Sequence, residues 1–243
     1  MEFERIKNID PTKSSPLPQS VSLEKTDSKV EDKETGDEYF EKGNDMQLEH
    51  FVVLLSKGIL RVSDLIEKDG KYYSRKMPLE NMPLAREQEM EAEFFILKYL
   101  FGDPDHYVSG THLNHLKNES NQFAHYDYDR AFSNVVPNKN ILLRKLGNFF
   151  LKKEVEAVFK NKMKQLKDQP SQQNFSSILK EKLSLFKDTL QDASFFNAVL
   201  NKSGLSLTGR FSFLKGNSET ERANELRKYL LDRVFLLEKI SNP

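Results

Sequence analysis

Cysteine is absent from the 243-residue chain. Without thiol groups, the chain can form neither a disulfide framework nor a zinc site with thiolate ligands. A fold that needs no disulfides suits a reducing compartment, so we expect a cytoplasmic protein.

Long apolar runs are absent too. No stretch approaches the roughly 18 apolar residues that a membrane-spanning helix requires, and no apolar signal-peptide core follows Met1. We therefore expect neither a transmembrane segment nor a Sec signal peptide.

The chain has no net charge, because 37 basic side chains balance 37 acidic ones. An excess of positive charge is the usual footprint of nucleic-acid binding, and its absence predicts no nucleic-acid partner. Internal repeats and long heptad runs are also missing from the sequence, which argues against a solenoid or a coiled coil.

The first 45 residues differ in composition from the rest. They contain three prolines, no sustained apolar period, and more acidic than basic side chains. Such a segment cannot bury enough apolar surface to order itself, so residues 1–45 are predicted to be a disordered acidic segment. The remaining chain is mildly basic.

Helical periodicity begins at Met46. It predicts an amphipathic helix over residues 46–57, a second short helix over 59–67 and a strong helix over 84–101. Between the last two, residues 71–74 can form a short strand or an extended linker.

Two pairs of aspartates flank a predicted β-hairpin. Asp103 and Asp105 lie in the loop after the third helix, and Asp127 and Asp129 follow the hairpin, whose polar turn is residues 118–122. A hairpin would bring the two pairs together. Phosphoryl transfer needs carboxylates of this kind, one to orient the acceptor hydroxyl and one to hold Mg²⁺ on the nucleotide phosphates.

The order of these parts resembles the catalytic lobe of phosphatidylinositol-kinase-like and HipA-like kinases, a group that includes effectors secreted by intracellular bacterial pathogens. The resemblance covers residues 72–132 and begins with Tyr73, Ser74 and Arg75, which match the hinge after the nucleotide-binding lobe. It implies the C-terminal lobe of a kinase-like fold, a protein partner and translocation into a host cell.

The resemblance also assigns roles to individual side chains. Asp105 matches the catalytic-loop aspartate, and Asp127 matches the aspartate that holds the metal. The implied site residues are Asp103 and Asp105 for catalysis, Asp127 and Asp129 for the metal, and His106 and His125 as accessory residues. Mg²⁺ and ATP are expected as cofactors only if the protein is active.

Two departures from the family argue against activity. The family has an asparagine as a second Mg²⁺ ligand five residues after the catalytic aspartate, where this chain has Gly110. The family also has a sheet-rich ATP lobe with a glycine-rich loop, whereas the residues before the hinge are predicted to be helical and contain no G-x-G-x-x-G motif. The N-terminal ATP lobe is therefore predicted to be missing or rudimentary. The protein is predicted to be a pseudokinase that acts as a binding or regulatory effector.

Three other functions stay open. The protein is an active atypical phosphotransferase, with a protein or a phosphoinositide as acceptor, if its nucleotide site takes another form. It is a non-enzymatic helical interaction module if the two aspartate pairs lie apart. A metal-dependent hydrolase is the third, because four histidines fall near the aspartates, namely His106, His112, His115 and His125. Strand geometry opposes it, since His112 and His115 would lie on opposite faces of a strand.

Residues 138–243 are predicted to be helical and to pack on the same core as residues 46–137. A last helix begins with a capping box of Ser218 and Glu221. The bases between Lys139 and Lys167 suit either an anionic membrane surface or a solvated helix face. The expected fold class is mostly α with a small β-hairpin (α+β), divided into residues 1–45, a truncated kinase-like core over 46–137, and the helical residues 138–243.

Overall fold

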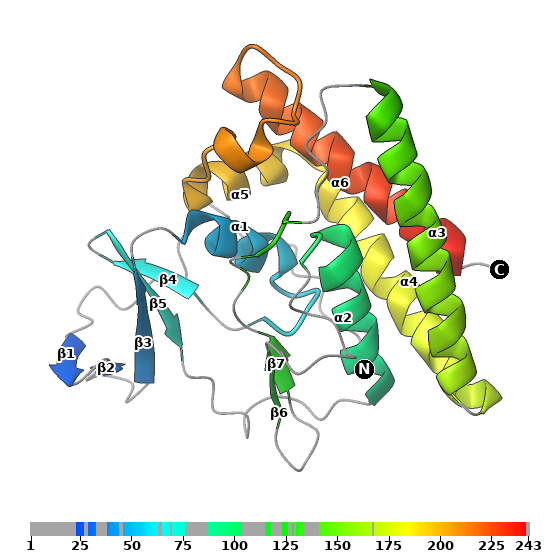
Figure 1. The fold of residues 1–243 in the computed structure, drawn as a ribbon. Helices are drawn as coiled ribbons and strands as arrows, with labels where there is room; N and C mark the ends of the chain where they lie inside the picture. The colour runs from blue at the N-terminus through cyan, green and yellow to red at the C-terminus, as the bar shows by residue number, and fades with distance from the viewer. Residues whose placement is uncertain are drawn as a thin grey trace.

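The computed structural model describes residues 23–26, 29–32, 38–43, 46–62, 65–68, 70–75, 87–103, 115–117, 123–125, 128, 130–133, 141–166 and 168–241. This part of the chain is mostly helical and holds one five-stranded and one two-stranded sheet (Figure 1). The predicted α+β class is therefore confirmed.

The larger sheet is antiparallel, and its strand order is β1-β2-β3-β5-β4. Its strands are β1 (Leu23–Thr26), β2 (Lys29–Asp32), β3 (Glu38–Gly43), β4 (Leu65–Lys68) and β5 (Lys71–Arg75). Tyr39 of β3 lies opposite Arg75 of β5, and the register shifts between Glu41 and Gly43. Strand β5, the last of these five strands in chain order, thus lies inside the sheet, between β3 and β4.

This sheet corrects two expectations. The short helix predicted over residues 59–67 is wrong, because residues 59–62 are irregular and Leu65–Lys68 forms β4. The residues before the predicted hinge were expected to be helical, with the ATP lobe missing or rudimentary, whereas the structure has four short strands there and the hinge residues lie in the fifth. The strands have only four to six residues, which is too short for a clear alternation of apolar and polar side chains.

The structure also differs in part from the disorder predicted for residues 1–45. Strands β1, β2 and β3 fall within residues 23–43, where the composition indicated no order. Strand β3 pairs with β5, which lies beyond α1 in the chain, so local composition carries no signal for that pairing. Residues 1–22 lie outside the described residues.

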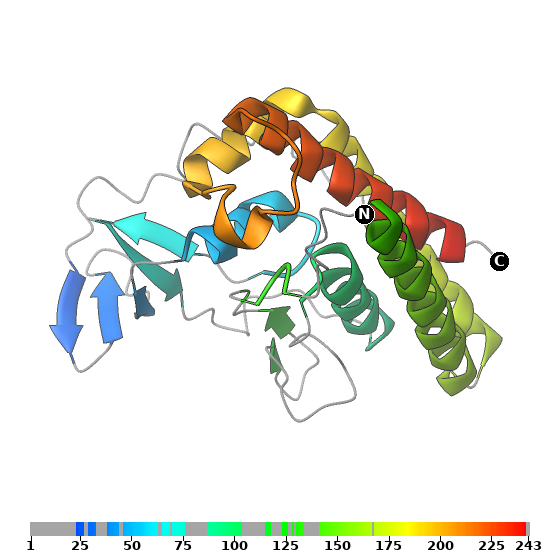
Figure 2. The same ribbon diagram turned by 45° about the horizontal axis from the view of Figure 1, so that its top comes forward.

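Helix α1 (Gln47–Ser56) follows β3 and confirms the first predicted helix. Its apolar side chains Phe51, Val52, Val53 and Leu55 are buried. The helix ends before Gly58, whose φ of 80° is a conformation that residues with a Cβ rarely adopt. In Figures 1 and 2, α1 lies between the sheet and helix α5 (Ala193–Ser203).

Helix α2 (Glu87–Leu100) and the hairpin of β6 (His115–Lys117) with β7 (Phe123–His125) come next, and both confirm the predictions. The hairpin attaches to the segment after α1. Val62 and His125 form a parallel β-bridge, and the His125 backbone N–H donates to the Arg61 carbonyl oxygen at 2.7 Å.

The C-terminal part consists of α3 (Ile141–Gln165), α4 (Gln169–Gln191), α5, the short 3₁₀ helix η3 (Gly209–Phe211) and α6 (Glu219–Ser241). Helix α4 packs on both α2 and α6, as the rotated view in Figure 2 illustrates for α4 and α6. The predicted capping box is present, with the Glu221 N–H donating to Ser218 Oγ and the Ser218 N–H donating to the Glu221 carboxylate. Among the described residues, no helix is both long and apolar enough to cross a membrane.

One apolar core joins α1, α2 and the C-terminal helices. Phe132 lies near its centre, with its ring centroid 6.5 Å from that of Phe51, 6.2 Å from Phe101 and 5.2 Å from Phe211. Residues from the two halves of the chain therefore share a core, and α1 contributes to it from the sheet side.

Candidate functional site

A lysine of the sheet forms an ion pair with a glutamate of the first helix. Lys42 Nζ in β3 lies 3.8 Å from Glu49 Oε1 in α1, and the Glu49 side chain is 1% exposed whereas that of Lys42 is 21% exposed. An ionised carboxylate at such a depth needs a positive partner. Lys42 is such a partner for Glu49.

Sequence reasoning missed this pair because Lys42 lies in the segment predicted to be disordered. The available signal was weak: the apolar residues Tyr39 and Phe40 stand just before Lys42, and Glu49 falls in the first turn of a predicted helix.

Tyr128 marks the point where three buried carboxylates converge. It is fully buried in the turn after β7. Burial, together with the negative charges of Glu49, Glu93 and Asp103, raises the pKa of the Tyr128 hydroxyl well above its ordinary value. Those carboxylates come from α1, α2 and the loop after α2, so the three elements meet around this phenol.

The first predicted aspartate pair is described only in part. Asp103 is fully buried, and its backbone N–H donates to the Leu97 carbonyl oxygen at 3.4 Å. Its negative charge contributes to the raised pKa of Tyr128, and its catalytic role stays a prediction. Asp105 and His106 lie outside the described residues, and their roles stay predictions.

The second pair, Asp127 and Asp129, also lies outside the described residues. The chain on either side of the two pairs is nevertheless joined. The Phe132 N–H donates to the Phe101 carbonyl oxygen at 2.6 Å, and Phe132 has a φ of 61°, which is unusual for a bulky side chain. The segment that carries both aspartate pairs therefore starts and ends at neighbouring points.

Glu93 of α2 is the centre of a buried charged group. Its carboxylate accepts from the Arg61 backbone N–H at 2.9 Å and from Lys182 Nζ, and lies 3.0 Å from His125 Nε2. Burial alone would raise the pKa of Glu93, but Lys182 and His125 lower it to about 2. We call this group, formed by Arg61, Glu89, Glu93, His125 and Lys182, the Glu93 cluster.

His125 was predicted as an accessory site residue, and the structure places it inside the Glu93 cluster. Its side chain is fully buried, and its ring stands edge-on to Phe94 with centroids 4.9 Å apart. Among the described residues, no group of three or more histidines, cysteines and acidic residues is arranged to hold a metal ion. His106 and His112 of the hydrolase hypothesis lie outside those residues.

The predicted hinge residues lie in β5, the last strand of the sheet in chain order. Tyr73 and Ser74 are buried in β5, which is followed in the chain by α2.

The basic face predicted between Lys139 and Lys167 is partly occupied by the protein's own acids: Lys162 pairs with Glu91 of α2 at 2.6 Å.

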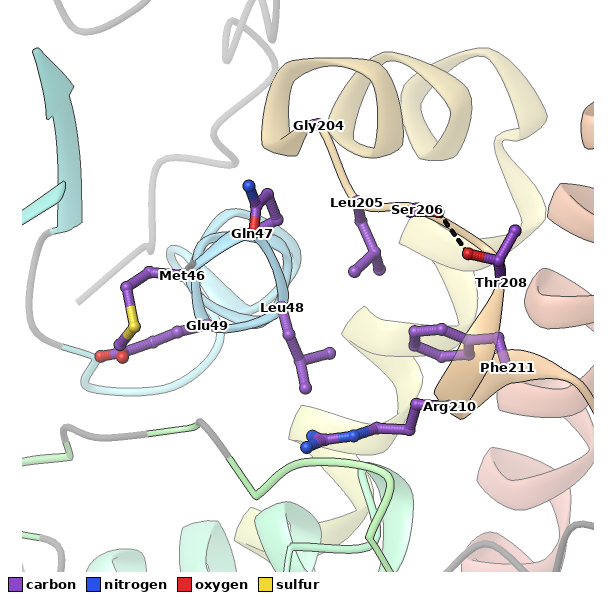
Figure 3. A pocket seen from close by; sticks show the side chains of 10 residues that line it. All are labelled: Met46, Gln47, Leu48, Glu49, Gly204, Leu205, Ser206, Thr208, Arg210 and Phe211. Carbon is purple, nitrogen blue, oxygen red and sulfur yellow. Dashed lines mark hydrogen bonds between the residues drawn. The ribbon is translucent and has the colours of Figure 1, made fainter. Parts of the chain in front are cut away.

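A cavity of about 380 Å³ lies at the amino end of α1 (Figure 3). Leu48 of α1 points toward Leu205 and Phe211 on the opposite wall, and Arg210 extends beneath Leu48. The Arg210 guanidinium donates to the Ala131 carbonyl oxygen at 3.0 Å, so this base connects η3 to the turn after Tyr128. The cavity is lined by Met46, Gln47, Leu48, Glu49, Gly204, Leu205, Ser206, Thr208, Arg210 and Phe211.

Comparison with known proteins adds no relative to this description. No family model, no curated protein and no solved structure matches the chain.

Proposed function

We propose that the chain is a kinase-like protein that binds ATP with Mg²⁺ and transfers a phosphoryl group. The observation that carries this proposal is the ion pair of Lys42 with Glu49. In protein kinases, a lysine on the third strand contacts the nucleotide phosphates and pairs with a glutamate of the following helix, and the pair must be in place for activity. Here the lysine is on the third strand and the glutamate on the helix that follows it.

The order of the other parts supports the same proposal. The hinge residues lie in β5 of a short sheet, α2 follows, and the two aspartate pairs then flank the hairpin of β6 and β7. In this proposal Asp105 orients the acceptor hydroxyl, and Asp127 with Asp129 holds Mg²⁺. Tyr128 takes the place of the aromatic residue that follows the metal-binding aspartate in kinases, where its packing separates active from inactive states. The full burial of Tyr128 supports this assignment.

A thermal-shift titration with ATP and Mg²⁺ tests the nucleotide site. A ligand that binds only the folded state raises the melting temperature, because it stabilises that state by about 2.7 kcal/mol when its concentration is a hundred times its Kd. We expect wild-type protein to show this shift and Lys42→Met to lose most of it, because the variant removes the phosphate contact. Asp127→Asn should retain a shift with ATP alone and lose the added effect of Mg²⁺.

Lys180→Met is the matched control, because Lys180 is an exposed lysine on α4 that has no place in the proposed site. It should melt and respond to ATP like the wild type. A wild-type protein that shows no shift at millimolar ATP would contradict the proposal.

A catalytically degenerate protein is the second candidate, and Gly110 is the observation that favours it. If the second Mg²⁺ ligand is missing, the nucleotide can bind without efficient transfer. Nucleotide binding without transfer of labelled phosphate to protein or phosphoinositide acceptors would select this candidate, with the protein acting as a regulatory effector. Delivery into a host cell and a protein partner belong to the same proposal and rest on the family resemblance.

A further inference from the structure

We infer that the Glu93 cluster is a positioning device that holds Glu49 beside Lys42. It fixes the segment after α1 to the helical part of the protein, and α1 carries Glu49. The inference rests on the proposed function, because it assigns a purpose to the cluster only if the ion pair serves nucleotide binding.

The cluster is hydrogen-bonded to the backbone of the segment that follows α1. Lys182 Nζ donates to the Ile59 carbonyl oxygen at 2.8 Å, and the Arg61 N–H donates to Glu93 at 2.9 Å. The Arg61 carbonyl oxygen accepts from the His125 N–H at 2.7 Å. Two residues that follow the carboxyl end of α1, Ile59 and Arg61, are thereby attached to α4, α2 and β7.

The side chains of the cluster define one position for this segment. Arg61 Nη2 lies 2.9 Å from Glu89, and Lys182 Nζ lies 2.8 Å from Glu93. Apolar contacts tolerate small shifts along a helix, whereas buried ion pairs lose much of their energy when their partners move apart. A charged anchor therefore sets the position of α1 more narrowly than apolar packing alone.

The middle of α1 is attached to the same body. Phe51 stands edge-on to Phe196 of α5 with centroids 5.9 Å apart, and α1 packs along α5. Lys42, in contrast, belongs to the sheet. The ion pair thus joins a sheet residue to a helix that is attached to the helical part through α5 and through the segment after the helix, and the cluster supplies the charged contacts of that attachment.

A double-mutant cycle on Mg-ATP affinity tests this inference. Lys182→Met keeps an apolar stem and removes the ammonium group that binds Ile59 and Glu93. In the wild-type background we expect it to weaken Mg-ATP binding by about tenfold, measured by calorimetric titration below the melting temperature of every variant. In the Glu49→Gln background, Lys182→Met should change the affinity by less than about twofold, because the residue that the cluster positions has already lost its charge.

Two further variants separate positioning from folding. In His125→Gln the amide nitrogen can occupy the place of Nε2 and donate to Glu93, so the affinity should stay near that of the wild type. In His125→Leu this contact is lost, and the affinity should fall as it does in Lys182→Met. Lys180→Met, two residues away on α4, should have no effect. These variants carry the test if Lys182→Met does not fold.

The outcomes separate the inference from the proposed function. If wild-type protein binds no nucleotide, the proposed function and this inference both fall. If it binds and Lys182→Met and His125→Leu keep its affinity, or if Lys182→Met lowers affinity equally in both backgrounds, the cluster does not act through Glu49. Only the inference is then overturned.

Discussion

At the scale of single residues, charge buried in the interior defines this molecule. Glu49, Glu93 and Asp103 are all at most 1% exposed, although acidic side chains are almost never fully buried without partners. Lys42 forms an ion pair with Glu49, and Lys182 and His125 both pair with Glu93. Such pairs add little net stability compared with apolar packing, but breaking one leaves an uncompensated charge.

Glu93→Gln should therefore destabilise the protein by about 3 kcal/mol near neutral pH. The pKa of Glu93 is lowered from 4.5 to about 2 in the folded state, so its charge stabilises the fold above pH 4.5. That contribution disappears as the pH falls through 2. The destabilisation caused by the substitution should accordingly shrink between pH 4.5 and pH 2.

Urea unfolding of the wild type and Glu93→Gln at several pH values measures this difference. Glu181→Gln removes an exposed carboxylate from α4 and should have little effect at any pH. A penalty for Glu93→Gln that stays constant from pH 7 to pH 3 would mean that the carboxylate is not paired as described.

At the scale of elements, helices could be predicted from the sequence and most strands could not. Helices α1, α2 and α6 have ten residues or more, enough for the apolar period to repeat. Strands β1 to β5 are short, and β3 pairs with a strand from beyond α1. The pairing of β3 with β5, which joins the two halves of the sheet, comes from tertiary contacts that no window of local sequence contains.

The same reasoning explains which parts of the candidate site were found. The aspartates of the loops stand together in the sequence, so their pairing suggested a function. Glu93 is one of four glutamates in α2, and its partners Arg61, His125 and Lys182 are scattered along the chain. The one local signal is that Glu93 stands between Ala92 and Phe94, at a position where α2 is buried.

Asp192 offers a test of how the C-terminal elements are joined. It ends α4 and caps α5, where its carboxylate accepts from the Phe195 N–H at 2.9 Å. Asp192→Ala should cost about 1 kcal/mol of unfolding free energy in denaturant titrations. Gln191→Ala, at the exposed neighbouring position, should be nearly neutral. Equal effects of the two variants would show that the cap contributes nothing.

At the scale of the whole molecule, α1 belongs to the helical part although the chain places it between two strands of the sheet. Its apolar side chains join the main core, which extends to α6 and also takes in Leu65 of β4 and Tyr72 of β5, whereas Tyr39 and Tyr73 of the sheet form a separate small cluster. Among the described strands of the sheet, these two buried side chains in the main core are fewer than α1 alone contributes.

Hydrogen exchange should reveal this division. Regions with a larger buried core open at higher free energy, so the amides of α1 should be protected as strongly as those of α4 and α5. Amides of β3 and β5 should exchange at a lower free energy. Exchange of α1 together with the strands, followed by mass spectrometry of its peptides, would contradict the assignment of α1 to the helical part.

The attachment of α1 also determines which part can close on a ligand. Because Glu49 is fixed with the helical part, its separation from Lys42 changes only when β3 moves. If the proposed nucleotide site closes on its ligand, the sheet is the part that we expect to move. A molecule bound to an edge strand of the sheet would then change the distance between Lys42 and Glu49 without contacting the aspartates.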